Sequence, residues 1–231
     1  MKKLITLSVA SLAFAAMADN FSPNIGVQQF SATTDNFILP VKFDSLNASA
    51  ISAKELVATN GLVAGTTLYV FQDGSYTSWV LENSGWVAMA KVSDTELNPT
   101  QPSDGQVLAS GSAIWITPVN GKTFSIYGKV ITSKTSTIVR GKTNLLANPT
   151  DATVTGSTLA EKLSGVAQVK DKITPIGGSF AGYYVYSGTT TGWVHVNGTT
   201  ITKNATLPDI AANQGFWYVA SGSGDPGVIN W

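Results

Sequence analysis

The tripeptide Gly-Trp-Val occurs at residues 85–87 and again at residues 192–194, each time within the same succession of β-forming segments. An aromatic run precedes each copy, LYVF at 68–71 and YYVY at 183–186. A segment with a central tryptophan follows each copy, GSAIWI at 111–116 and QGFWY at 214–218. Aromatic and β-branched residues favour strands. The ordered recurrence therefore predicts a β-unit that is duplicated within the chain.

Turn signals divide each copy into short strands. Residues 67–72 lead into Asp73-Gly74, a dipeptide typical of hairpin turns, and residues 76–81 form the expected returning strand. Asn197-Gly198 is the corresponding signal in the second copy. Several short strands separated by turns are typical of a β-sandwich or a small barrel. We therefore expect an all-β fold of two tandem β-sandwich-like repeats, residues 19–130 (the first unit) and residues 131–231 (the second unit).

One short helix is expected in each unit. Ser52 and Glu55 have the i, i+3 spacing of a capping box, and Thr158 and Glu161 repeat that spacing in the second unit. In such a box the hydroxyl accepts a hydrogen bond from an N–H of the first turn, and the carboxylate reaches back to the N–H of the cap. The two boxes fall at matching places, which supports a duplication independently of the tryptophans.

Residues 1–18 have the three parts of a secretory signal peptide. Lys2 and Lys3 carry the positive charge, residues 4–14 form a short apolar core, and residues 16–18 (AMA) offer small side chains for cleavage before Asp19. The core is shorter than the roughly 20 residues that a spanning helix needs. We therefore predict export to the cell surface or the medium, without a transmembrane segment.

Composition excludes several classes of function. Removing Lys2 and Lys3 from the 14 basic residues leaves 12 against 14 acidic ones, a net charge of −2 that is too balanced for an electrostatic grip on nucleic acid. Charged residues make up only 12% of the chain, but 43% hydrophobic residues exclude disorder. The chain has no cysteine, so packing must supply the stability that disulfides give many exported proteins.

The second unit resembles a module of secreted bacterial surface proteins. The resemblance rests on NLLANP at 144–149, YVY at 184–186, GW at 192–193 and QGFW at 214–217. The first unit departs from it, because Leu39-Pro40 replaces the Asn-Pro pair and Ala113-Ile114-Trp115 replaces Gly-Phe-Trp. Such modules often occur in tandem. The resemblance implies an exported β-module and brings no active site with it.

Candidate catalytic and metal-binding residues are few. His195 is the single histidine, and no G-x-S-x-G elbow accompanies it, so an exposed or half-buried sheet histidine is the favoured interpretation over a catalytic triad. Asp94, Glu96 and Asp104 could offer oxygens to calcium, but they lack the spacing of a calcium loop, and a solvated loop is favoured. We expect a non-enzymatic protein without cofactor or metal.

Six tryptophans are the remaining lead to a binding site. Trp115 and Trp217 have apolar neighbours in both copies and are predicted to lie in the core. Trp79 and Trp193, with His195 two residues further along, are the candidates for exposure. An exposed ring on a sheet can stack on the apolar face of a sugar, so these three residues form the predicted ligand site.

The sequence favours a structural subunit of the bacterial exterior, part of a surface layer, a fibre or a matrix, that binds itself or other surface proteins. Residues 20–34 could add a strand to the sheet edge of a neighbour, with Phe21, Ile25, Val27 and Phe30 as the assembly strand. A secreted glycan-binding or adhesin module is the alternative. A hydrolase would need clustered carboxylates around loops 93–105 or 187–192, and nothing in the sequence singles out such a pair.

Overall fold

A computed structural model of the protein describes residues 25–31, 37–44, 51–52, 62–72, 75–83, 85–91, 97–102, 107–108, 113–117, 123–131, 134–176, 181–212 and 214–231. The fold is all-β, as predicted. The strands of the first unit are β1 (Ile25–Ser31), β2 (Phe37–Pro40), β3 (Phe43–Asp44), β4 (Ile51–Ser52), β5 (Thr67–Gln72), β6 (Ser75–Glu82), β7 (Gly85–Lys91), β8 (Leu97–Pro102), β9 (Val107–Leu108), β10 (Ala113–Thr117) and β11 (Thr123–Val130). The elements of the second unit are β12 (Thr135–Ile138), β13 (Thr143–Ala147), α3 (Gly156–Leu163), β14 (Lys172–Pro175), β15 (Tyr183–Tyr186), β16 (Trp193–Asn197), β17 (Thr200–Thr202), β18 (Gly215–Val219) and β19 (Gly227–Asn230).

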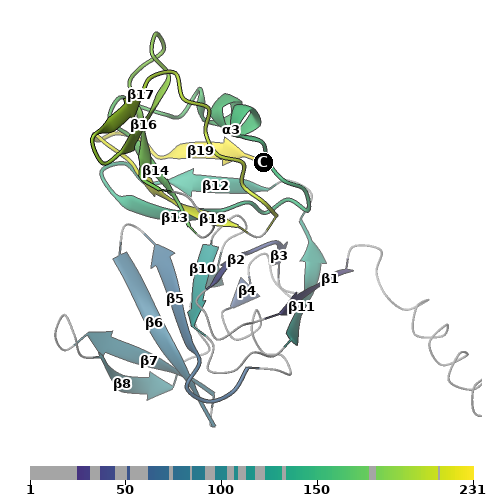
Figure 1. The fold of residues 1–231 in the computed structure, drawn as a ribbon. Coiled ribbons are helices and arrows are strands. Elements are labelled where there is room, and N and C mark those ends of the chain that lie inside the picture. The colour runs from purple at the N-terminus through teal and green to yellow at the C-terminus, as the bar shows by residue number, and fades with distance from the viewer. Residues whose placement is uncertain are drawn as a thin grey trace, which may run out of the picture.

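Each unit is built on one six-stranded antiparallel sheet, and the two sheets have the same connectivity (Figure 1). The strand order is β2-β10-β5-β6-β7-β8 in the first unit and β13-β18-β14-β15-β16-β17 in the second. In both, the earliest strand lies at an edge, the latest lies beside it, and four consecutive strands follow. A duplicated unit would produce this shared order. Pro40 ends β2, which lies at the sheet edge, where strands tolerate proline best.

Strand register places the two Gly-Trp-Val tripeptides in equivalent positions. Val87 lies opposite Val80 on β6, and Val194 lies opposite Val185 on β15. The YYVY run at 183–186 therefore corresponds to β6. The expected match between 183–186 and LYVF at 68–71 is wrong by one strand. Composition could not separate the two strands because β5 and β6 are adjacent and both rich in aromatic and β-branched residues.

A smaller sheet packs on one face of each large sheet. Its order is β1-β11-β3 in the first unit and β12-β19 in the second. The short pair β4–β9 also has a counterpart, the isolated bridge between Val154 and Ile210, which likewise follows the edge strand and precedes the strand beside it. Each unit therefore has two layers, which is the sandwich-like arrangement expected.

Helix α3 begins three residues earlier than its sequence signal predicts. Its N-cap is Thr155, whose Oγ1 accepts a hydrogen bond from the Thr158 N–H at 3.3 Å, so the capping box assigned to Thr158 and Glu161 is wrong. The Gly156 N–H also donates to Asp209 Oδ1 at 2.8 Å, and a Cβ at Gly156 would lie 1.6 Å from a backbone oxygen. This close approach fixes the start of the helix. In the first unit Ser52 closes β4, and Glu55 lies outside the described residues.

The asparagines of the NLLANP segment are buried and hold the backbone around the edge strand. Asn144 Oδ1 accepts from the Val139 N–H at 2.8 Å. Asn148 Nδ2 donates to the Ile210 carbonyl at 2.9 Å, and its Oδ1 accepts from the Thr150 N–H at 2.9 Å. A buried amide is stable only when such partners satisfy it. This part of the motif therefore has a structural role.

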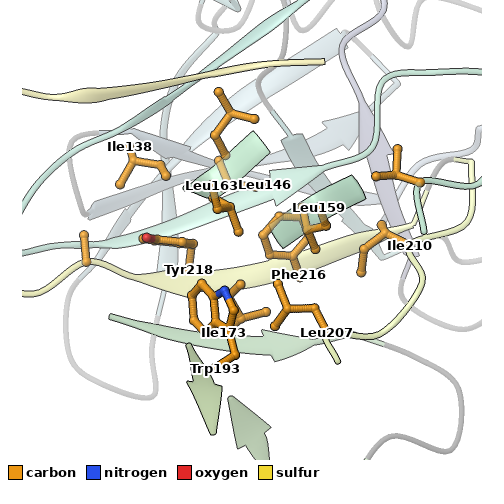
Figure 2. Close-up of a cluster of buried hydrophobic side chains, with 13 residues drawn as sticks. Ile138, Leu146, Leu159, Leu163, Ile173, Trp193, Leu207, Ile210, Phe216 and Tyr218 are labelled. Carbon is orange, nitrogen blue, oxygen red and sulfur yellow. The ribbon is translucent and has the colours of Figure 1, made fainter. Parts of the chain in front are cut away.

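A hydrophobic core fills the space between the layers of each unit. In the first unit it joins Phe43 of β3 to Leu68, Trp79, Trp86 and Ile114 of the large sheet. Figure 2 shows the core of the second unit, where side chains from β12, α3 and the large sheet converge. The labelled residues are Ile138, Leu146, Leu159, Leu163, Ile173, Trp193, Leu207, Ile210, Phe216 and Tyr218.

The expected exposure of Trp79 and Trp193 is wrong. Both side chains are only 5% exposed and belong to the cores of their units. The alternation of a strand assigns its residues to two faces, but the face that points inward depends on which layer packs against the sheet. That information lies in the tertiary contacts.

We predict that Trp193→Ala lowers the free energy of unfolding by about 3–5 kcal/mol, because it empties a large volume in a packed core. Urea unfolding followed by circular dichroism measures the loss. Val27→Ala is the control, since Val27 is 68% exposed and its truncation should change stability by less than about 0.5 kcal/mol. A Trp193→Ala protein as stable as the control would contradict the core assignment.

Candidate functional site

His195 lies on β16, where its ring packs against a tyrosine and makes a hydrogen bond to the backbone. Its ring stacks on Tyr184 with 4.6 Å between centroids and 25° between planes, and its Nε2–H donates to the Ala181 carbonyl at 2.8 Å. Trp193, two residues before it, is in the core. The predicted trio of Trp79, Trp193 and His195 therefore gives no exposed aromatic platform. His195 itself is half-buried, which agrees with the sheet histidine that the sequence favoured.

The predicted assembly segment contains β1, and its partner lies in the same chain. Ile25 to Ser31 pair antiparallel with Lys129 to Thr123 of β11. Ile25 is half-buried and Val27 is exposed, whereas Phe21 lies outside the described residues and only the backbone of Phe30 is described. The strand is thus present, and in this structure it completes its own unit.

Two glycines that face each other allow β1 to pack closely against the rest of the first unit. Gly26 lies opposite Gly128, and Phe43 packs over both. A Cβ at Gly26 would lie 2.6 Å from Phe43 Cε1, and a Cβ at Gly128 would lie 2.7 Å from Phe43 Cβ. Larger side chains would force the strands away from this ring. The glycine pair therefore makes the docking of β1 specific in register.

An aromatic cluster that the sequence did not single out lies on the other face of the first large sheet. Tyr76 is 46% exposed, and its ring lies 6.0 Å from Tyr69 and 5.5 Å from Phe71 between centroids. Burial, with a smaller contribution from Tyr76, raises the pKa of Tyr69. Phe71 in turn packs edge-on against Trp217 of the second unit at 4.6 Å. The cluster therefore runs from the surface to the contact between the units.

The contact between the units, here called the inter-unit interface, joins the two large sheets through the faces opposite their cores. Figure 1 shows β13 and β18 against β10 and β2. Trp115 and Trp217, predicted as core residues, are half-buried here, with 6.0 Å between ring centroids. The interface consists of Ile38, Phe71, Ala113 and Trp115 from the first unit and Leu145, Ala147, Ile176 and Trp217 from the second.

Polar contacts border this interface. Lys42, which is 4% exposed, donates from Nζ to the Thr150 carbonyl at 3.0 Å and to Asp151 Oδ1 at 2.9 Å. Burial lowers the pKa of Lys42 more than the attraction of Asp151 raises it, while the hydrogen bond from Lys42 lowers the pKa of the exposed Asp151. Desolvation of the ammonium group thus offsets the attraction, as is usual for buried ion pairs. We infer that the contacts of Lys42 help to set the orientation of the two units relative to each other.

The most elaborate polar cluster lies inside the second unit around Asp171, whose side chain is fully buried. Its carboxylate accepts from Arg140 Nη1 at 2.6 Å and from the Tyr218 hydroxyl at 2.6 Å. It also accepts from the N–H groups of Gln168 and Ser221 at 2.9 and 2.6 Å. These donors satisfy the carboxylate, and the Asp171 side chain has no solvent exposure. The cluster is built to support the fold.

The donors around Asp171 set its ionisation. Burial by itself raises the pKa of Asp171, but the hydrogen bonds from Gln168, Tyr218, Ser221 and Arg140 together outweigh burial and leave the pKa below the usual value. Burial and the hydrogen bond to Asp171 raise the pKa of the Tyr218 hydroxyl far above its ordinary range. At neutral pH the carboxylate is therefore charged and the phenol is protonated, so the phenol can donate.

We predict that Asp171→Asn lowers the free energy of unfolding at pH 7 by about 3–5 kcal/mol, because Arg140 would lose its buried partner. Since the pKa of Asp171 is lower in the folded chain, its contribution is complete above the unfolded pKa of about 3.9 and is lost as the pH falls below it. Urea unfolding at pH 7 and pH 3 should show a smaller gap between wild type and variant at pH 3.

The matched control is Asp225→Asn, at an exposed position of the same unit. It should behave as wild type at both pH values. If wild type and Asp171→Asn lost the same free energy of unfolding between pH 7 and pH 3, Asp171 would not be the group that controls stability at low pH.

No group of three histidine or acidic side chains within the described ranges is placed to hold a metal ion. Asp94, Glu96 and Asp104 lie outside the described residues. None of the described helices has the length and apolar character needed to cross a bilayer. No protein-family model, curated protein or solved structure matches the chain.

Proposed function

We propose that this protein is an exported, non-enzymatic structural subunit of the bacterial cell exterior that assembles by exchanging strand β1 between copies. The observation that carries the proposal is the seven-residue ladder between β1 and β11. Among the described strands, β1 stands at the end of its sheet and pairs with β11 alone. A strand held in this way can leave as a piece and form the same ladder on another copy.

The packing of β1 favours exchange of this strand in a fixed register over non-specific pairing between strands. Gly26 and Gly128 meet under Phe43, and this fit would be the same whether β1 comes from the same chain or from a neighbour. Register slips would bring larger side chains under that ring. Exchange therefore predicts assemblies with a defined repeat, which is the property a surface layer or fibre requires.

The predicted leader peptide, the low charge and the resemblance to secreted surface modules support a location outside the cell. The separate, well-packed cores of the two units support a role as a rigid building block. Self-association is the central expectation, and other surface proteins are further candidate partners.

We predict that deleting residues 19–31 from the exported chain abolishes assembly, because the donated strand is lost. Gly26→Val should weaken assembly in the same direction, since the added side chain collides with Phe43 and Val130. Light scattering with negative-stain microscopy, at low and high protein concentration, gives the readout. Val27→Thr is the matched control on the same strand, because Val27 points into solvent.

The Val27→Thr control should assemble like wild type. Unchanged assembly by the deleted chain, or a wild-type protein that stays monomeric at every concentration, would overturn strand exchange. Circular dichroism of each variant separates lost assembly from lost folding.

A second candidate function, binding of glycans, is favoured by the exposed Tyr76 beside Tyr69 and Phe71. The burial of Trp79 and Trp193 removes the site first expected, but Tyr76 offers a ring face to solvent with a hydroxyl at its end. Tyr69 and Phe71 of the neighbouring strand β5 pack against the Tyr76 ring, which limits the reorganisation needed to stack on a sugar.

For this candidate, Tyr76→Ala should remove binding to a glycan array while lowering stability by less than about 1 kcal/mol, because the ring is half in solvent. Tyr76→Phe keeps the ring and should keep most of the binding. If wild type binds no glycan on the array, or if Tyr76→Ala binds as well as wild type, this candidate is excluded.

A further inference from the structure

The inter-unit interface pairs equivalent positions of the two units. Trp115 lies opposite Ile38 in the first sheet, and Trp217 lies opposite Leu145 in the second. On the other side, Trp115 faces Tyr69 and Trp217 faces Thr174, so Phe71 and Ile176 also correspond. The equivalent pairs are Ile38 with Leu145, Pro40 with Ala147, Phe71 with Ile176, Ala113 with Gly215, and Trp115 with Trp217.

An interface that joins the same positions on both sides is isologous, the kind by which identical subunits pair across a two-fold axis. Here the two tryptophans meet each other, and a small residue stands at the start of both β10 and β18. A Cβ at Gly215 would lie only 2.6 Å from Ile38 Cγ2, so the sheets approach closely at that point. Each face therefore fits the face of a like unit, in the same chain or in another.

The connection between the units is short. β11 ends at Val130 and β12 begins at Thr135. Lys134 is held in the second unit, where its Nζ donates to the Pro149 carbonyl and its own carbonyl accepts from the Trp231 N–H. Short connections between two stable units favour exchange of a whole unit between chains. If the two units of one chain separate, each exposes an apolar face. The complementary face is then available on another copy of the chain.

We propose that the inter-unit interface is also the surface through which the chain binds a second copy of itself, the first unit of one chain packing on the second unit of its partner. Two chains then close into a dimer with two such interfaces, and a chain that does not close extends into a filament. The proposal uses residues other than those of β1 and does not depend on strand exchange.

Two variants that each damage one side of the interface test it by complementation. Within a single chain, W115E or W217R sets a charge against a tryptophan and weakens the interface. In a mixture, an exchanged heterodimer has one intact tryptophan pair and one Glu–Arg pair. We expect each variant alone to be mainly monomeric and the equimolar mixture, refolded together from mild denaturant, to form a 1:1 dimer in light scattering and native mass spectrometry.

The matched control mixes W217R with L145E. Both changes lie on the second unit, so every exchanged pairing keeps a damaged interface, and the mixture should stay monomeric. A W115E and W217R mixture with no more dimer than this control overturns the proposal. Adding G26V to both chains distinguishes exchange of a whole unit from exchange of strand β1. The heterodimer must persist if whole units exchange. Its loss would assign the association to β1 and overturn unit exchange.

A crosslinking experiment keeps the test decisive should the charged variants fold poorly. The chain has no cysteine, and a Cβ at Gly215 would lie 3.0 Å from Ile38 Cβ, close to the roughly 3.5–4.5 Å of a disulfide. Oxidised I38C/G215C should be a covalent monomer after dilute refolding and gain covalent dimer at high concentration. I38C/V228C, with the second thiol on exposed β19, measures random crosslinking, and dimer no higher than in that control overturns the proposal.

Discussion

The whole architecture depends on the alternation of side chains along β10 and β18, the strands next to the edge strand in the two large sheets. Each strand sends alternate residues to opposite faces of its sheet. Ile114 and Ile116 fill the core of the first unit, whereas the alternating residues Ala113 and Trp115 face the second unit. Phe216 and Tyr218 play the core role in β18, with Trp217 on the other face. Because these strands are apolar on both faces, each sheet must be covered twice, once by its own small sheet and once by the other unit.

The two units use the same framework with different chemistry in their interiors. The position of Asp171, one residue before β14, corresponds to Thr66, one residue before β5. Thr66 is buried, and its Oγ1 has no hydrogen-bond partner among the described residues, whereas Asp171 is surrounded by donors. Tyr218 of the ionic cluster likewise corresponds to Ile116. A buried charge pair adds little net stability but is costly to break, so we expect protonation of Asp171 to destabilise the second unit.

The two surfaces that we propose for self-association lie at different places on the same chain. β1 offers backbone hydrogen bonds at the end of a small sheet, and the inter-unit interface offers apolar side chains from two large ones. Both contacts are already satisfied within one chain. Association through either surface therefore replaces one contact by an identical one in another chain, and its equilibrium depends mainly on concentration and on the rate of opening.

The sequence by itself determined the all-β class, the hairpin of β5 and β6, and the equivalence of the two Gly-Trp-Val segments, because local propensity and turn chemistry act over a few residues. It also indicated that Trp115 and Trp217 are alike, but it did not reveal that they meet each other. Only the tertiary structure decided that Trp79 and Trp193 point inward, that Thr155 caps α3, and that β1 pairs with β11. It likewise brought Arg140 to Asp171. Each of these depends on which layer or distant strand lies opposite a residue, and such contacts between residues far apart in the chain leave no periodic mark in the sequence.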